Sequence, residues 1–133
     1  MKYDSVTVSA VIPAAAKDVY DAWMSSRGHA AMTGNPASVS ARVGGKFTAW
    51  DGYISGKTLE LSPPTRILQA WRTTEFAAEE EDSLLEILLE QAKGGTKVTL
   101  KHTKIPAGQG PSYKQGWIDY YFKPMRDYFR KKT

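Results

Sequence analysis

The C-terminal segment from Tyr113 to Phe129 constrains the fold of this chain more than any other part of the sequence. Placed at helical spacing, its large apolar residues form one continuous arc of roughly 200°, about twice the width of the stripe on an ordinary surface helix. The arc contains Tyr113, Trp117, Ile118, Tyr120, Tyr121, Phe122, Pro124, Met125, Tyr128 and Phe129. A helix with so wide an apolar arc must be enclosed on two or three sides. We therefore expect a bent antiparallel sheet to wrap it, a packing that often leaves a cavity.

Alternating apolar and polar residues earlier in the chain predict the strands of that sheet. We expect strands near 5–12, 37–42, 46–50, 53–61, 66–73, 84–91 and 96–103. Asp51-Gly52 is typical of a tight hairpin, because both central residues of a type I′ turn need positive φ. Short connections between neighbouring strands indicate an antiparallel meander.

Helical spacing predicts two short helices after the first strand, over 14–24 and from Ser25 through Met32. In the final helix, Ser112 and Gln115 predict a capping box at the N-terminus. Pro124 lies in the interior of that helix, where a proline removes one hydrogen bond and clashes with the preceding turn. We therefore expect a bend at Pro124, which would let the helix follow a curved sheet.

The composition limits the cellular compartment and the kinds of chemistry that we expect for this chain. At 133 residues the chain is long enough to bury a core, so we expect one domain over 1–133. The absence of cysteine excludes disulfides, thiolate catalysis and the usual structural zinc sites. The charged N-terminus, Met1-Lys2-Tyr3-Asp4, is unlike a signal peptide, and no apolar run reaches the roughly 18 residues of a membrane span. We expect a cytoplasmic protein with no membrane span.

The net charge of +4 gives only a loose attraction to acidic surfaces. The dense basic run Arg130-Lys131-Lys132 is also what the C-terminus of a helix favours. A nucleic-acid surface would interleave exposed aromatic residues with a basic patch, whereas here the aromatic residues lie on the arc predicted to be buried. We expect no nucleic-acid partner.

Two glycine-rich segments resemble phosphate loops only superficially. Gly44-Gly45-Lys46 and Gly94-Gly95-Thr96-Lys97 are each followed by a predicted strand, so they lack the helix N-terminus that holds phosphate. Hairpin turns are the better interpretation. The sequence shows no nucleophile elbow and no constellation of acid, base and nucleophile, so we expect a protein that is not an enzyme.

Five residues are candidates for lining a cavity between the sheet and the final helix: Trp71, His102, Trp117, Tyr121 and Met125. Filling the core is the alternative role for the same side chains, since each aromatic residue buries about 150–250 Å². The two roles can hold for different residues, and the pattern by itself leaves both open.

His102 alternates with Val98 and Leu100 and so faces the apolar side of its strand, which favours a hydrogen-bonded structural role. A role as general base would also need an acid partner, for example Glu86 or Glu90 on a neighbouring strand. His29 lies far away in a predicted helical turn. Two isolated histidines without a further ligand at suitable spacing predict no metal site.

Many short motifs, in one order from Ser5 to Phe129, resemble the C-terminal domain of the activator of heat-shock protein 90 ATPase. They are Gly44-Gly45-Lys46-Phe47, Asp51-Gly52, Gly56, Glu60-Leu61, Pro63 or Pro64, Arg66-Ile67, Trp71-Arg72, Gly95-Thr96, Val98-Thr99-Leu100, His102-Thr103, Ile105-Pro106, Gly116-Trp117 and Tyr120-Tyr121-Phe122. The resemblance implies the α+β helix-grip fold of the START-like superfamily. That fold has a curved antiparallel sheet of about seven strands around a long C-terminal helix, with two short helices after the first strand.

Two functions follow as expectations. The first is a non-catalytic binding module that holds a small hydrophobic molecule between the sheet and the C-terminal helix, without cofactor or metal. The second is a co-chaperone-like protein that contacts heat-shock protein 90 through strand edges, loops and the charged helix face of Lys123, Arg126 and Arg130. The family's eukaryotic activators carry an additional N-terminal domain, for which we expect no room here. We expect a monomer or a weak dimer paired through an edge strand.

Overall fold

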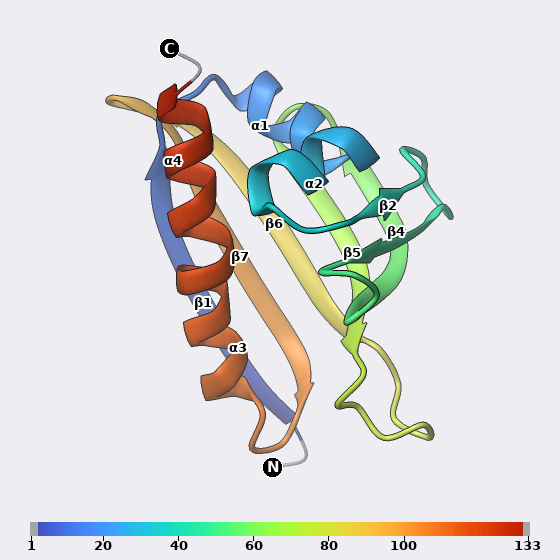
Figure 1. Ribbon diagram of the computed structural model, residues 1–133. Helices are drawn as coiled ribbons and strands as arrows, with labels where there is room; N and C mark the ends of the chain where they lie inside the picture. Colours follow the sequence, from blue (N-terminus) through green and yellow to red (C-terminus); the bar gives the residue numbers. More distant parts are fainter. Residues whose placement is uncertain (1–2, 132–133) are drawn as a thin grey trace.

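The computed structural model describes residues 3–131 and shows one curved, seven-stranded antiparallel sheet with a long C-terminal helix along one of its faces (Figure 1). Met1, Lys2 and Lys132, which figure in the sequence-based expectations, lie outside the described residues. The strands are β1 (Tyr3–Ile12), β2 (Ser38–Val39), β3 (Lys46–Ala49), β4 (Ile54–Ser62), β5 (Arg66–Thr73), β6 (Ser83–Ala92) and β7 (Gly95–Pro106). The helices are α1 (Ala16–Trp23), α2 (Ser26–Thr33), α3 (Gly110–Gly116), the π-helix η1 (Trp117–Phe122) and α4 (Lys123–Lys131).

The sheet order is β1-β7-β6-β5-β4-β3-β2, so β2 to β7 form the predicted meander and β1 pairs with β7 at one edge. The predicted fold class is confirmed. One strand is much shorter than predicted, because the 37–42 segment is paired only at Ser38 and Val39. Beyond them the chain turns back at Gly44, which has φ 84°, and Gly45, whose absent Cβ would lie 2.6 Å from the Ser40 hydroxyl. One further bond, from Ser40 N–H to the Lys46 carbonyl at 3.1 Å, leads into this turn.

The β3–β4 hairpin has the positive φ values that the sequence predicts, 57° at Asp51 and 88° at Gly52. Its loop is longer than the two residues of a type I′ turn, because Ala49 and Ile54 are the last paired residues. Trp50 also adopts a positive φ of 53°, which is uncommon for a large side chain. The hairpin thereby contributes an indole ring that contacts the C-terminal helix at Tyr120, with ring centroids 5.4 Å apart.

The C-terminal helix runs without a break from Gly110 to Lys131, and Figure 1 shows it as one continuous rod. Where we expected a bend at Pro124, the chain makes a wider, π-helical turn immediately before it, in which Lys123 N–H donates to Ile118 C=O. The backbone thus adapts to the missing proline donor within the preceding turns. The predicted capping box is wrong. The helix begins at Gly110, two residues before Ser112. Its N-cap is Gln109, whose side chain makes no capping hydrogen bond.

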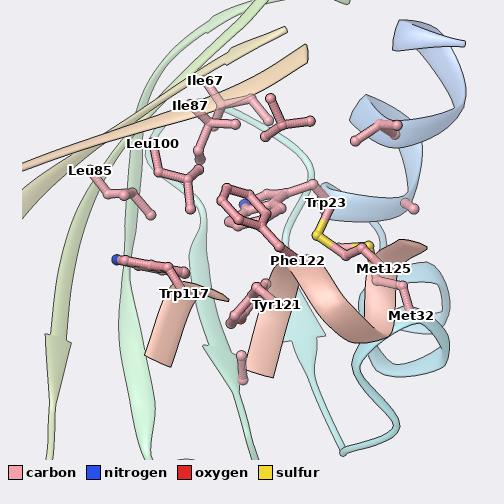
Figure 2. Packing of buried hydrophobic residues seen from close by; sticks show 14 of the residues in the cluster. Trp23, Met32, Ile67, Leu85, Ile87, Leu100, Trp117, Tyr121, Phe122 and Met125 are labelled. Carbon is pink, nitrogen blue, oxygen red and sulfur yellow. The ribbon is translucent and has the colours of Figure 1, made fainter. Parts of the chain in front are cut away.

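The core lies between the sheet, the C-terminal helix and the α1–α2 pair (Figure 2). Its labelled members come from all three layers: Trp23, Met32, Ile67, Leu85, Ile87, Leu100, Trp117, Tyr121, Phe122 and Met125. The helix is therefore enclosed as its wide apolar arc predicts. Tyr120 is the exception on that arc, since 59% of it is exposed. Among residues 3–131, no helix is long and apolar enough to cross a membrane.

Candidate functional site

A cavity of about 420 Å³ lies between the β3–β4 hairpin, β5 and the first half of the C-terminal helix. Its lining is mostly aromatic: Trp50, Tyr53, Ile54, Trp71, Tyr113, Gly116, Trp117, Tyr120 and Tyr121. Tyr53 and Tyr120 are the exposed members of this set, 37% and 59% respectively, so they mark the side on which the cavity meets solvent. The rest of the wall is buried or half-buried.

Gly116 helps to keep this space open. It lies within the continuous helix with φ −61° and ψ −40°, so its conformation does not require glycine. Apart from the neighbouring residues and the helix's own backbone, a Cβ at this position would meet only one atom within 4 Å, Cδ2 of Tyr120 at 3.8 Å. The missing side chain therefore leaves room on the cavity side that a larger residue would occupy.

Trp71 and Trp117 serve both of the roles that the sequence left open. They are 3% and 2% exposed, as core residues are, yet both belong to the cavity wall. Their ring centroids lie 5.3 Å apart, and Tyr113 lies 5.1 Å from Trp71 at an interplanar angle of 82°. Such edge-to-face and tilted contacts hold aromatic rings in fixed orientations. The cavity wall is thus a rigid part of the core.

His102 lies behind this wall and does not line the cavity. Trp117 Nε1–H donates to His102 Nδ1 at 3.2 Å, and His102 Nε2 lies 2.8 Å from the Ser83 hydroxyl. Because Ser83 in turn donates to the Trp71 carbonyl at 2.6 Å, the proton of the neutral imidazole is on Nε2. Burial lowers the pKa of His102 to about 3. The geometry is that of a neutral, hydrogen-bonded structural residue.

The acid partners considered for His102 are not near it. Glu86 and Glu90 alternate with the buried Leu85, Ile87 and Leu89 of β6, so they lie on the opposite face of the sheet from the core. Glu86 forms an ion pair with Arg66, 2.6 Å from its Nε. The hypothesis that Glu86 or Glu90 assists His102 as a general base is therefore wrong.

His29, which the sequence left isolated, contacts a wall residue of the cavity. Its Nε2 lies 2.7 Å from the Tyr121 hydroxyl, and its Nδ1 lies 3.0 Å from the Trp23 carbonyl. Since a carbonyl only accepts, Nδ1 carries the proton and Tyr121 donates to Nε2. Burial lowers the pKa of His29 and raises that of Tyr121. One sequence feature could have indicated that His29 is buried. It lies three and four residues before Met32 and Thr33, on the same face of the helix, and both of these residues are buried.

The polar atoms around the cavity are nearly all paired. Tyr113 donates to Gln109 at 2.7 Å, and its hydroxyl also contacts that of Thr73 at 2.7 Å. Tyr53 donates to the Glu75 carboxylate, and burial together with this contact raises the pKa of Tyr53 to about 12. The exception is Trp50 Nε1. Within residues 3–131 it is the one buried side-chain nitrogen or oxygen with no hydrogen-bond partner.

The remaining predicted site residues lie elsewhere. Met125 is fully buried in the core and is absent from the cavity wall. Lys123 is exposed and pairs with Asp119 at 3.2 Å, while Arg130 lies 3.8 Å from Asp127. Arg126 is half-buried. In the described part of the chain, no group of three or more metal-binding side chains is arranged to hold an ion.

A curved seven-stranded sheet, a long C-terminal helix and a cavity between them define a helix-grip domain. The family described as Activator of Hsp90 ATPase homolog 1-like protein matches residues 13–130, and the chain belongs to this family. It is 31% identical over 99 residues to the human activator of 90 kDa heat shock protein ATPase homolog 1, an alignment that covers 74% of this chain and 29% of the human protein. The chain thus spans less than a third of that relative.

Solved structures show the same fold. An HSP90 activator from Plasmodium falciparum superposes with a TM-score of 0.80 at 22% identity, over 96% of this chain and 95% of that one. The protein MLL2253 from Mesorhizobium loti superposes with a TM-score of 0.81 at 16% identity, over 98% and 99% of the two chains. At these identities the structures establish the shared fold.

Proposed function

We propose that this protein is a non-catalytic binding module that holds a small apolar molecule in the cavity between the sheet and the C-terminal helix. The observation that carries the proposal is the cavity itself, about 420 Å³ with seven aromatic residues among the nine that line it. Small-molecule sites commonly have volumes of about 300–1,000 Å³, with apolar walls and few polar groups. The fixed orientation of Trp71 and Trp117 keeps such a site preformed.

The chemistry of the wall supports binding rather than catalysis. The two histidines nearest the cavity are both buried, neutral and engaged on both ring nitrogens. Neither histidine lines the cavity; each is bonded instead to a wall residue, His29 to Tyr121 and His102 to Trp117. The family description likewise names an activator of an ATPase, which is a regulatory role.

The first experiment compares native and denaturing mass spectra of the purified protein. Extra mass that disappears on denaturation is the expected result, and its value identifies the ligand class. If the protein is bare, micromolar lipids, sterols and aromatic metabolites are added while tryptophan fluorescence and amide NMR shifts are recorded. A bare protein whose spectra no compound alters would contradict the proposal.

Gly116 offers a matched pair of variants for the same experiment. Gly116→Leu is expected to place its side chain in the cavity and abolish binding, because Gly116 lines the cavity and a Cβ at this position meets no side-chain atom within 4 Å except Cδ2 of Tyr120. Gly116→Ala adds a single methyl group at a compatible helical position and is expected to keep binding. Equal thermal stability of the two variants shows that the loss of binding is not a loss of the fold. Undiminished binding by Gly116→Leu would place the ligand outside the cavity.

A second function, contact with heat-shock protein 90, is favoured by the names of the relatives, which are activators of that chaperone's ATPase. The surface proposed for it includes Lys123, Arg126 and Arg130 on the helix. A pull-down with the chaperone in its nucleotide-bound state is expected to retain the protein. No association under those conditions would exclude this function for the chain.

A further inference from the structure

The strand β1 forms a long, unpaired edge of the sheet. It pairs with β7 on one side and is the last strand of the sheet on the other (Figure 1). Its ten residues form a regular strand, because the bulge beside it lies in β7, where Thr103 and Lys104 are opposite Ser5 alone. The unpaired backbone N–H and C=O groups along an edge of this length are a template for a further strand.

Natural sheets usually protect such an edge, and β1 lacks the usual protection. At the opposite edge of the sheet, β2 is only two residues long, which leaves little for another chain to pair with. In contrast, β1 contains no lysine, arginine or proline, and its one charged residue is Asp4. The Asp4 carboxylate accepts the N–H groups of Gly108 and Gly110, so it is already engaged at the start of α3.

The side chains on the outer face of β1 form an uncharged, exposed row. The row consists of Tyr3, Ser5, Thr7, Ser9 and Val11. At its two ends Tyr3 is 48% exposed and Val11 is 41% exposed. Two of the five large apolar side chains that the described part of the chain leaves exposed therefore lie on this one strand. Covering them with a partner strand is favourable.

This row is complementary to itself. In two antiparallel copies of β1 aligned on Thr7, each Thr7 lies opposite the Thr7 of the second copy. The same alignment places Ser5 opposite Ser9, and Tyr3 opposite Val11. Aromatic residues opposite β-branched residues, and threonine opposite threonine, are among the cross-strand pairs that stabilise a sheet. The alignment thus gives each exposed end of the row an apolar partner.

The charges beside the edge allow this alignment. On the same face of the sheet, Lys101 of β7 lies opposite Thr7, one strand back from the edge. The two copies of Lys101 would be three strand spacings apart, about 14 Å, which exceeds the screening length of about 8 Å at physiological ionic strength. The row itself contributes no charge to the contact.

We propose that two copies of this chain pair antiparallel through β1, in register about Thr7, to form one continuous sheet with seven strands from each copy. The pairing is closed by a two-fold axis, because only the short β2 edges remain and a longer assembly has no edge to grow from. Since β1 contributes no residue to the cavity wall, this inference is independent of the proposed ligand.

Single cysteines test the register, because the chain contains no cysteine of its own. In a glutathione redox buffer, Thr7→Cys is expected to form a disulfide-linked dimer. Directly opposed Cα atoms lie about 4.5–5.5 Å apart, within the range of about 4.4–6.8 Å that a disulfide spans. Ser5→Cys and Ser9→Cys are matched controls on the same exposed row. Each alone should stay reduced, whereas the double variant Ser5→Cys/Ser9→Cys should link.

Sedimentation velocity from micromolar to millimolar concentration measures the association itself. The wild type is expected to dimerise as its concentration rises. Thr7→Glu places two carboxylates opposite each other across the two-fold axis, and within its own chain it lies opposite Lys101, which preserves the monomer fold. We expect its dimer dissociation constant to rise roughly 1.5- to 5-fold. Ser9→Glu adds the same charge without meeting itself and should have a smaller effect.

Three outcomes would overturn the inference. The first is a wild type that remains monomeric at millimolar concentration. The second is a dimer in which Thr7→Cys stays reduced, because the contact then lies on another surface. The third is a disulfide that forms as readily in Ser5→Cys or Ser9→Cys alone as in Thr7→Cys, because the strands are then not aligned on Thr7.

Discussion

Trp117 stabilises the fold and shapes the cavity through different atoms of one side chain. Its ring packs against Trp71 and Tyr121, with centroids 5.3 Å and 4.9 Å away, and its N–H holds His102. The side chain is 2% exposed. A residue so placed is sensitive to truncation, because removing it leaves a void and also an unpaired buried imidazole nitrogen.

Trp117→Ala is therefore expected to lower the free energy of unfolding by about 3–5 kcal/mol. Urea denaturation followed by circular dichroism measures the change. Trp117→Phe, which keeps most of the ring but removes the N–H, should lie between the wild type and the alanine variant. An unchanged midpoint for Trp117→Ala would refute the core assignment.

The lowered pKa of His102 predicts how the stability of the folded protein depends on pH. Its pKa is about 3 in the folded protein and about 6.5 in an unfolded chain, so between these values the unfolded state binds the extra proton. The contribution of this group is then fully present above about pH 6.5 and is lost as the pH falls toward 3. We expect the free energy of unfolding to decrease over this window, by up to about 1.4 kcal/mol per pH unit from His102.

Urea unfolding at pH 7, 6, 5 and 4 measures this slope. The carboxylates also titrate in this range, and the lowered pKa of His29 acts in the same direction, so the comparison is with His102→Gln. Glutamine can keep a donor and an acceptor but does not titrate. The variant should show a shallower slope, and an identical slope would mean that His102 titrates normally in the folded protein.

At the scale of the elements, β1 fixes the start of the C-terminal helix. Asp4 Oδ2 accepts the N–H groups of Gly108 and Gly110, each at 2.9 Å. A carboxylate placed there satisfies backbone donors that the helix itself leaves unpaired and interacts well with the helix dipole. The chain thus uses a residue more than 100 positions away where a local capping box had been expected.

Asp4→Ala is expected to lower the free energy of unfolding by about 1–2 kcal/mol, as for the loss of a helix cap. Hydrogen exchange of the Gly110 amide should accelerate more than that of amides within the sheet. Asp4→Asn keeps one side-chain oxygen acceptor and should retain a large part of the stability. Unchanged exchange at Gly110 in Asp4→Ala would show that these bonds are not formed in solution.

At the scale of the whole molecule, the two proposed functions use different surfaces. The cavity is bounded by the first half of the C-terminal helix, whereas Lys123 and Arg126 lie further along it. Binding in an uncharged cavity should depend little on salt. A contact made through exposed charges is screened over about 8 Å at physiological ionic strength.

Reversal of Lys123 and Arg126 to glutamate is therefore expected to weaken chaperone association, and added salt should weaken it in the wild type. Pull-downs at 50 and 300 mM salt would measure both effects. Gly116→Leu is the control, since it should abolish ligand binding and leave chaperone association intact. Association that tolerates both charge reversals would move the contact to another face of the molecule.

The sequence by itself determined the architecture, because periodicity is a local property of the chain. The wide arc of the final helix required a partner on several sides, and the alternation in 84–91 and 96–103 could be satisfied only by strands with one buried face. The same alternation placed His102 among core residues, and the sequence also nominated Trp71, Trp117 and Tyr121, which line the cavity.

Only the tertiary structure decided which contacts complete that architecture. The bond between His29 and Tyr121 spans 92 residues, and the cap from Asp4 to Gly110 spans 106. The Trp50 N–H has no hydrogen-bond partner, and the space beside Gly116 is empty. Both features depend on how all of the surrounding elements pack together. No local pattern encodes such features, since a void or an unsatisfied donor is a property of the whole packing and not of any one segment.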